Sequence, residues 1–526
     1  MLLVMAAVLW SSVRGPGVLK VAARSQSSVI VQIHFAGGDN ISTDKNSTAF
    51  ENEFSSPQAR ALESQTLDKL SRAPGVWFKD KLPTGASDGS ALLRPLLDDF
   101  LKSEWVFEMR DAPASPEYAL AIRLDVNRAQ LWQNNLRSLL ESWTKITAQD
   151  IPGGWELKKD VAPNLFRFVR AGNWVIIGCG QDELPTIDDW SRERTIPQIG
   201  TDWLSAKLDW PRLAQLFPAL AAFDFPQINL HTAGKDGNLQ LTGTLDLTQP
   251  LPSLEKWQVP AEIIHQPLTS FTAARGFAPW LNNQAWAKDF RLSPDPDQLF
   301  IWSLGLMPLQ TFIAVPVPDA TRALAQLGEN LSADASWQSR FMFPMAINKT
   351  PGRISLQGAP FIAPEVLALR ESSGNFLFGD VFPNIPRGKA PPPEVFQVLN
   401  QPNLVFYHWE ITSARLKNLP QLTQLALMLT KHFQLNGSSA ASQWLELIGP
   451  TAGVSVTEAT ETGPMELSFS RSSPTGLTAV ELIALANWLE TPNFPGCDLR
   501  LPTKRFTPHR PMKKLAAPMT TTPAPH

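Results

Sequence analysis

Only two of the 526 residues are cysteine, Cys179 and Cys497, which is too few for a disulfide scaffold. Burial of apolar side chains must therefore hold the core together. Charged residues are also scarce, at 18% of the chain, and the net charge is −3. A protein without a broad positive surface is unsuited to nonspecific binding of DNA or RNA. We therefore expect no nucleic-acid partner.

Tyrosine is rare as well, with 2 Tyr beside 18 Trp. Tryptophan buries a large apolar area and carries a single N–H donor, so it serves either in a core or as a stacking platform for sugars and other ligands. The indoles are scattered from Trp10 to Trp488, mostly in or beside strand-like runs. This distribution favours core packing over a stacking site.

Local signatures of catalysis are missing. The sequence contains no G-x-S-x-G motif, no G-x-x-x-x-G-K-[ST] loop and no H-E-x-x-H motif. Its seven histidines form no cluster with the spacing of metal ligands. His34 and His408 lie in apolar, strand-like runs, which favours ordinary strand residues over ligands. We predict no catalytic residue, no cofactor and no metal site.

Two further patterns resemble functional motifs but fail on detail. Gly178-Cys179-Gly180 follows a strand-like run, yet the third glycine of a dinucleotide-binding turn is replaced by Glu183. Nothing in the sequence supplies a base for Cys179, which favours a buried strand-end cysteine over a nucleophile. Adjacent side chains point in different directions, so the acidic pairs Asp98-Asp99 and Asp188-Asp189 are interpreted as solvated surface.

A repeated unit of strand, acidic turn and amphipathic helix runs through the chain. Apolar runs at 118–124, 203–208 and 311–317 lead into Asp125, Asp209 and Asp319, each followed three positions later by arginine. A fourth run, 404–409, has Glu410 in the acidic position. Aspartate before a helix accepts hydrogen bonds from its free N–H groups. We interpret these acids as helix caps, with a set of catalytic carboxylates as the alternative.

Hairpins with alternating apolar and polar residues follow the units. Their turns are Lys235-Asp236-Gly237-Asn238 and Thr462-Gly463-Pro464. Strict alternation is typical of antiparallel sheets with one covered face and one wetter face. The sequence therefore predicts an α+β fold, with mainly antiparallel sheets and helices on one face.

The order of units predicts two tandem, duplicated lobes. The N-terminal lobe spans residues 28–258 and the C-terminal lobe residues 259–500, with the seam near 250–267. A helical stretch near 47–70 belongs only to the first lobe, and a closing helix at 478–489 follows the second. Residues 501–526 are rich in proline and threonine, carry five basic residues and no acid, and are predicted to form a disordered tail.

The chain begins with an apolar run, MLLVMAAVLWSSV, inside the segment 1–27. This run has the length of a signal-peptide core and is shorter than the roughly 20 residues of a membrane-spanning helix. No basic residue precedes it. We interpret residues 1–27 as an exported leader or membrane anchor, with a cytoplasmic protein as the alternative.

The leader, the first strand ending in His34-Phe35-Ala36-Gly37 and the repeated units together resemble large uncharacterised exported bacterial proteins, classed as domains of unknown function. The resemblance covers most of residues 28–490 and implies a periplasmic or membrane-anchored setting. It supplies no catalytic residues.

These features favour a noncatalytic binding or scaffolding protein of the bacterial cell envelope. Its partner would be an unknown envelope protein or a small ligand, with membrane attachment through the N-terminus as a further expectation. The alternative is an exported hydrolase whose site is assembled from distant residues. Convergent titratable groups with shifted pKa values would favour the enzyme.

Overall fold

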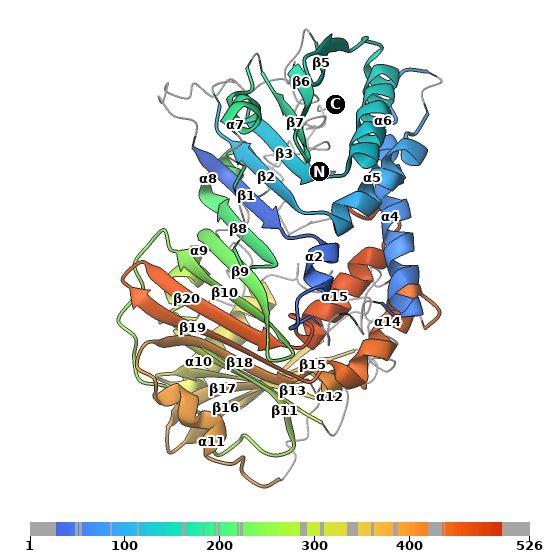
Figure 1. The fold of residues 1–526 in the computed structure, drawn as a ribbon. Helices are drawn as coiled ribbons and strands as arrows, with labels where there is room; N and C mark the ends of the chain where they lie inside the picture. The colour runs from blue at the N-terminus through green and yellow to red at the C-terminus, as the bar shows by residue number, and fades with distance from the viewer. Residues whose placement is uncertain are drawn as a thin grey trace, which may run out of the picture.

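The protein has an α+β fold in which helices flank a large antiparallel sheet (Figure 1). The structure is a computed structural model. It describes residues 28–496, with internal gaps at 48–50, 52–54, 81, 85–86, 113–114, 160–164, 182, 194–195, 198–199, 218–219, 221–224, 284–291, 306–309, 334–345, 359–361, 382–387, 419–433 and 436. The predicted leader 1–27, the predicted tail 501–526 and Cys497 lie outside the described residues.

Twenty described strands form the sheet. The first half of the chain contributes β1 (Val29–Phe35), β2 (Trp105–Arg110), β3 (Glu117–Arg123), β4 (Gln149–Ile151), β5 (Gly154–Lys158), β6 (Leu165–Ala171), β7 (Trp174–Gly180), β8 (Leu204–Asp209), β9 (Gln227–Lys235) and β10 (Asn238–Asp246). The second half contributes β11 (Leu268–Arg275), β12 (Gln298–Leu304), β13 (Thr311–Val317), β14 (Ala346–Thr350), β15 (Arg353–Gln357), β16 (Glu365–Glu371), β17 (Gly374–Asp380), β18 (Leu404–Ile411), β19 (Val454–Gly463) and β20 (Glu466–Ser473).

The helices of the first half are α2 (Gly38–Ser42), α4 (Pro57–Trp77), α5 (Ser90–Lys102), α6 (Val126–Thr144), α7 (Pro185–Glu193) and α8 (Trp210–Leu216). Those of the second half are α9 (Ala278–Asn283), α10 (Ala320–Ala333), α11 (Glu394–Gln397), α12 (Thr412–Leu416), α14 (Ala440–Ile448) and α15 (Ala479–Glu490), with short 3-10 turns at Val398–Asn400 and Gly449–Thr451. None of the helices in the described ranges is long and apolar enough to cross a membrane.

The strand pairings of the described residues are all antiparallel and connect the two halves of the chain. From edge to edge the order is β4-β5-β6-β7-β3-β2-β1-β8-β9-β10-β20-β19-β18-β11-β12-β13-β17-β16-β15-β14. Both halves have the same order, because adding ten to each label of the first half gives the second. The two predicted sheets are thus one sheet, joined where β10 pairs with β20.

The helices pack on both faces of the sheet, so the prediction of helices on one face was wrong. Leu120 and Ile177 lie opposite each other on β3 and β7 and pack with Trp132 of α6. Their neighbours Ala121 and Ile176 point the other way and pack with α7. The cause is visible in β3, where consecutive residues are buried instead of alternate ones. We call these surfaces the α6 face and the α7 face.

The two faces differ most over the five central strands, β8, β9, β10, β20 and β19. Residues directly opposite each other in neighbouring strands share a face. The α6 face here carries apolar side chains such as Leu230, Leu241 and Phe469. The α7 face is polar, and none of these side chains is buried: Ser205, Lys207, Asn229, His231, Gln240, Thr242, Thr244, Glu458, Thr460, Ser468, Ser470 and Ser472. The predicted alternation is confirmed for β10 and β20. It was wrong for β19, where Val454 and Val456 lie on the polar α7 face and Ser455 and Thr457 are the buried residues.

Three of the predicted aspartate caps are confirmed. Asp125 accepts hydrogen bonds from the backbone N–H groups of Asn127 and Arg128 at the start of α6. Asp209 and Asp319 each accept one from the N–H three residues later. In every case the carboxylate satisfies a donor that the first helical turn leaves free.

Replacing Asp125 by alanine removes both acceptors and is expected to lower the free energy of unfolding by about 1 kcal/mol. Urea denaturation followed by circular dichroism would measure the change. The exposed Asp189 on α7 provides the control, since its replacement by alanine removes a similar charge without a cap. Equal stability of the Asp125 variant and the wild type would contradict the capping role.

Helix α4 connects the first half to the end of the chain. Its residues Ala59 and Leu62 share an apolar cluster with α12, α14 and α15. Gln65 donates a hydrogen bond to Glu490, and Lys69 donates one to the carbonyl oxygen of Leu489. Helix α4 thus covers the described part of the predicted stretch 47–70 from Pro57 onward, continues to Trp77, and contacts the closing helix α15 (Figure 1).

Large aromatic side chains fill the cores of both halves. Trp132 and Trp155 are fully buried in the first half, and Trp302 is 1% exposed in the second. Trp302 stacks on Phe312 and packs against Phe378. The interpretation of the indoles as core residues is confirmed for these positions, whereas Trp280 and Trp488 are exposed.

Candidate functional site

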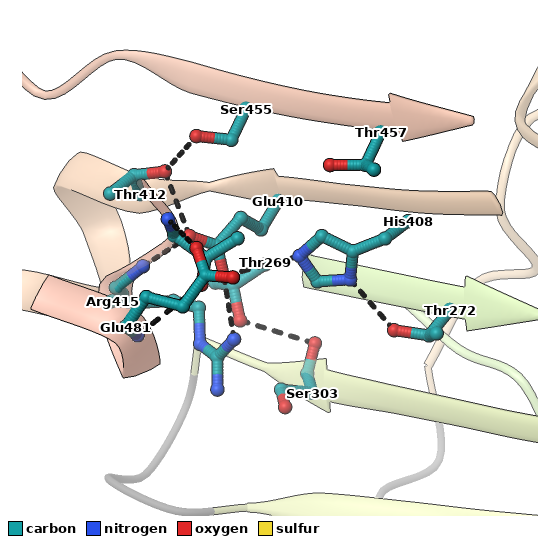
Figure 2. Close-up of polar contacts among 12 residues, drawn as sticks. Thr269, Thr272, Ser303, His408, Glu410, Thr412, Arg415, Ser455, Thr457 and Glu481 are labelled. Atoms are coloured by element: carbon teal, nitrogen blue, oxygen red, sulfur yellow. Dashed lines mark hydrogen bonds and ion pairs between the residues drawn. The ribbon is translucent and has the colours of Figure 1, made fainter. Parts of the chain in front are cut away.

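A buried polar cluster surrounds Glu410 on the α6 face of the second half (Figure 2). Glu410 and His408 are two residues apart in β18, and strand alternation therefore points both side chains to the same side. Thr272 of β11 lies opposite His408, and Ser455 of β19 lies opposite Glu410. Polar side chains from the neighbouring strands β11, β18 and β19 thus lie together beneath α12 and α15.

Both carboxylate oxygens of Glu410 are engaged. Oε1 accepts hydrogen bonds from the Thr412 hydroxyl at 2.8 Å and from the backbone N–H of Ala479 at 2.6 Å. Oε2 accepts one from Nη1 of Arg415 at 2.7 Å and lies 3.5 Å from Nε2 of His408. The Glu410 side chain is fully buried.

These contacts determine the charge of Glu410. Burial opposes ionisation, but the contacts with His408, Arg415, Ala479 and Thr412 together outweigh it and lower the pKa of Glu410 to about 2. The carboxylate is therefore an anion throughout the neutral range. A group that stays ionised cannot act as a general acid near neutral pH, so we interpret Glu410 as a structural anion.

Glu410 does cap a helix, but not the helix predicted from its position in the sequence. Residue Ile411 occupies the N-cap of the following helix, α12, and no side chain caps that end. The Glu410 carboxylate instead accepts the N–H of Ala479, the first residue of α15. Glu410 thus stabilises the N-terminus of α15, a helix distant from it in the sequence.

The same cluster contains a hydroxyl, an imidazole and a carboxylate in line. Nδ1 of His408 lies 2.8 Å from the Thr272 hydroxyl, and Nε2 faces Glu410. Figure 2 shows this succession across β11 and β18. Nucleophilic hydrolases use a similar combination of groups. Because Glu410 is also bound by Arg415 and two other donors, the cluster is equally suited to a purely structural role.

A separate hollow of about 440 Å³ opens at the strand ends of the first half. We call this cavity the hollow. Its wall includes Asn40, Asp44, Glu104, Arg123, Asp202 and Trp203. These residues lie at or next to the ends of β1, β2, β3 and β8, so antiparallel pairing brings them to one end of the sheet. Asp202 of the wall contacts Nδ1 of His231, on the polar part of the α7 face, at 2.8 Å.

The hollow is negatively charged. Glu104 contacts Nε2 of the buried His34 at 3.1 Å and Nη1 of Arg123 at 3.3 Å, and the contact with His34 lowers the pKa of Glu104. Asp44 accepts hydrogen bonds from the backbone N–H of Asn46 and from the indole of Trp203, which lower its pKa. Three carboxylates therefore belong to the wall, those of Asp44, Glu104 and Asp202.

The glycine-rich motif around Cys179 does not form a ligand-binding turn. Gly178, Cys179 and Gly180 lie within strand β7, not in a phosphate-binding turn. Cys179 is buried, and burial raises the pKa of its thiol to about 12, which disfavours the reactive thiolate.

The acidic pairs are not simply solvated surface. Asp99 is buried and accepts hydrogen bonds from the guanidinium of Arg128 and the indole of Trp132, so its interpretation as surface was wrong. Asp188 forms an ion pair with Arg167. Sequence position alone could not reveal these partners, which lie on other elements.

His34 and His408 lie in strands as expected, and each contacts a glutamate. Within the described ranges, no three or more His, Cys, Asp or Glu side chains are grouped so that they could hold a metal ion. Comparison with protein-family models, curated proteins and solved structures gave no match. The function is therefore inferred from the residues of this chain.

Proposed function

We propose that the protein is a noncatalytic binding or scaffolding protein of the bacterial cell envelope, and that its ligand occupies the hollow. The observation that carries the proposal is the composition of the wall. It combines Asp44, Glu104, Asp202 and Arg123 with indole groups, a few placed polar groups of the kind that orient a bound small molecule. Carboxylates with lowered pKa values favour binding over proton transfer.

The charge of the hollow favours a positively charged ligand. Of the described wall residues, Arg123 alone is basic, and it already contacts Glu104. Asp44 and Asp202 belong to the same wall, where they bind the indole of Trp203 and the imidazole of His231 respectively. Lys45 lies close enough to Asp44 to help lower its pKa. An ammonium or guanidinium group would add favourable charge pairing there. Small amines and cationic peptides are therefore the expected ligand class.

Thermal unfolding in the presence of a panel of amines tests this proposal. Spermidine, lysine and arginine amide are expected to raise the melting temperature of the full chain, whereas succinate is not. Asp202→Asn removes the charge of Asp202. About ten times more amine should then be needed for the same rise in melting temperature. Asp246→Asn on β10 is the matched control. Unchanged amine binding by the Asp202 variant would contradict the assignment.

The alternative is a hydrolase, favoured by the Thr272–His408–Glu410 succession. Ester, amide and phosphoester substrates should be screened with the purified full chain. Absence of turnover, or turnover that survives in Thr272→Ala, supports the noncatalytic proposal for this cluster. Turnover that disappears in Thr272→Ala while the variant stays folded would overturn it.

The envelope setting is supported by the apolar run at the start of the sequence. Cell fractionation with N-terminal sequencing of the native protein is the test. Cleavage within residues 1–27, or recovery with the membrane, would agree with the proposal. Recovery from the cytoplasm with Met1 intact would contradict it.

A tandem duplication is part of the same proposal. It is supported by the identical strand order of the two halves and by their spacing. The β6–β7 hairpin spans 165–180 and the β16–β17 hairpin spans 365–380. Gly37 and Gly276 follow the first strand of each half, and both have positive φ, at 91° and 76°. The proposed boundary between 28–258 and 259–500 falls in the segment between β10 and β11.

A further inference from the structure

A second group of buried polar side chains lies on the α7 face at the other end of the sheet. Glu365 begins β16 and Asp380 ends β17, and the two residues are direct partners in the antiparallel register. Directly opposed residues point to the same side of a sheet with neighbouring Cβ atoms. Asp380 is 5% exposed and Glu365 6% exposed. The chain therefore buries two carboxylates side by side.

The two carboxylates are not equally compensated. Glu365 forms an ion pair with Arg353 of β15. Both oxygens of Asp380 are buried, and neither has a hydrogen-bond partner among the described residues. One guanidinium thus faces two acidic groups. Burial and the charge of Glu365 raise the pKa of Asp380 to about 7, against the opposing effect of Arg353.

An amide oxygen lies on the same face of the adjoining strand. The backbone N–H of Leu304 donates to the carbonyl of Gln310, which extends the β12–β13 ladder by one pair. Gln310 therefore faces the same side as Phe312, which pairs with Asp380. Gln310 is 4% exposed, and no group in the described part of the chain forms a hydrogen bond with its Oε1.

Buried oxygens without partners require a compensating species. A buried carboxylate is normally paired, protonated or bound to a metal, and an unsatisfied group marks a missing ion, proton or water. Three oxygen-bearing side chains, from β16, from β17 and from the residue just before β13, supply acceptors and no donor apart from the Gln310 amide. Carboxylate and amide oxygens together prefer a hard cation.

We propose that Asp380, Glu365 and Gln310 bind one calcium ion. Carboxylate and amide oxygens are the ligands calcium takes in proteins, and water completes its flexible coordination shell. Magnesium demands stricter octahedral geometry and is expected to bind more weakly. Zinc and copper favour nitrogen and sulfur ligands, which these three residues do not offer. The site is independent of the hollow and of its proposed ligand.

Calorimetric titration of the full chain with calcium chloride, after removal of metal by EDTA and gel filtration, tests the site at pH 8. We expect one calcium ion to bind and the melting temperature to rise by a few degrees. Asp380→Asn should abolish both effects. It should still fold, because the amide removes a buried charge. Gln310→Leu should weaken calcium binding by about tenfold.

Glu329→Gln, an exposed position on α10, is the matched control and should bind calcium as the wild type does. Calcium binding that persists unchanged in Asp380→Asn would overturn the proposal. So would a wild type that binds no calcium and is stabilised in EDTA as pH falls from 8 to 5, because protons alone would then neutralise Asp380. That outcome would leave the amine-binding test of the hollow unaffected.

Discussion

Glu410→Gln is expected to lower the free energy of unfolding by roughly 3 kcal/mol. Removing one charge from a buried ion pair leaves the other uncompensated, and here the remaining charge is Arg415. The value lies at the lower end of the usual range because the Arg415 side chain is 22% exposed. Chemical denaturation of the full chain would measure the loss, with Glu446→Gln on the exposed side of α14 as the control.

The pH dependence gives this variant a second signature. The pKa of Glu410 is about 2 in the folded state, below its ordinary value. Its contribution to stability is therefore present at neutral pH and is lost as pH falls from about 4.5 toward 2. Glu410→Gln should lack this part of the acid-induced destabilisation. Parallel stability curves for the variant and the wild type across that interval would refute a buried, ionised Glu410.

Trp302→Ala is expected to lower the free energy of unfolding by roughly 3–5 kcal/mol. The side chain is 1% exposed and lies within an aromatic group, with its ring centre 5.5 Å from that of Phe312 and 5.9 Å from that of Phe378. Truncation removes the buried indole and leaves a cavity that stacked rings cannot readily close. Thermal and urea unfolding would measure the loss.

Trp280→Ala is the matched control, because Trp280 is 41% exposed and belongs to the same half. Its effect should stay below about 1 kcal/mol. Similar losses for the two variants would contradict the assignment of Trp302 to the core. A cavity as large as an indole could also be tested with small apolar ligands, which should restore part of the stability.

Local features of the fold could be predicted from the sequence. Residues 311–317 form a strand with the predicted limits, and Asp125 caps α6. The turn at 235–238 closes the β9–β10 hairpin as expected. These features depend on alternation, capping and turn chemistry within a few neighbouring residues, which one sequence displays directly.

Contacts between distant segments could not be predicted in the same way. The β10–β20 pairing joins Leu239 to Ser473, and no pattern within either strand specifies the other as its partner. Glu410 has the spacing of a local cap, yet it binds Ala479 because β18 continues one residue beyond it. The prediction of one covered face relied on alternating strands. Strand β7 does not alternate, because it is apolar on both sides and both sides are buried.

The candidate sites are non-local for the same reason. Glu104, Arg123 and Asp202 meet in the hollow only because antiparallel strands end at a common edge of the sheet. Asp380 and Glu365 are registered by the β16–β17 hairpin, and both residues are apparent in the sequence only as isolated acids. A search for acids directly opposed across a predicted hairpin could have found this pair.

The junction between the two halves has a consequence for synthesis on the ribosome. Strand β10 is complete once Asp246 has emerged, but its neighbour β20 begins only at Glu466. Until then the nascent chain presents nine residues of unpaired strand edge, a surface that promotes intermolecular pairing. Chains truncated before Glu466 should therefore self-associate, and production of the full chain should benefit from chaperones that shield this edge during translation.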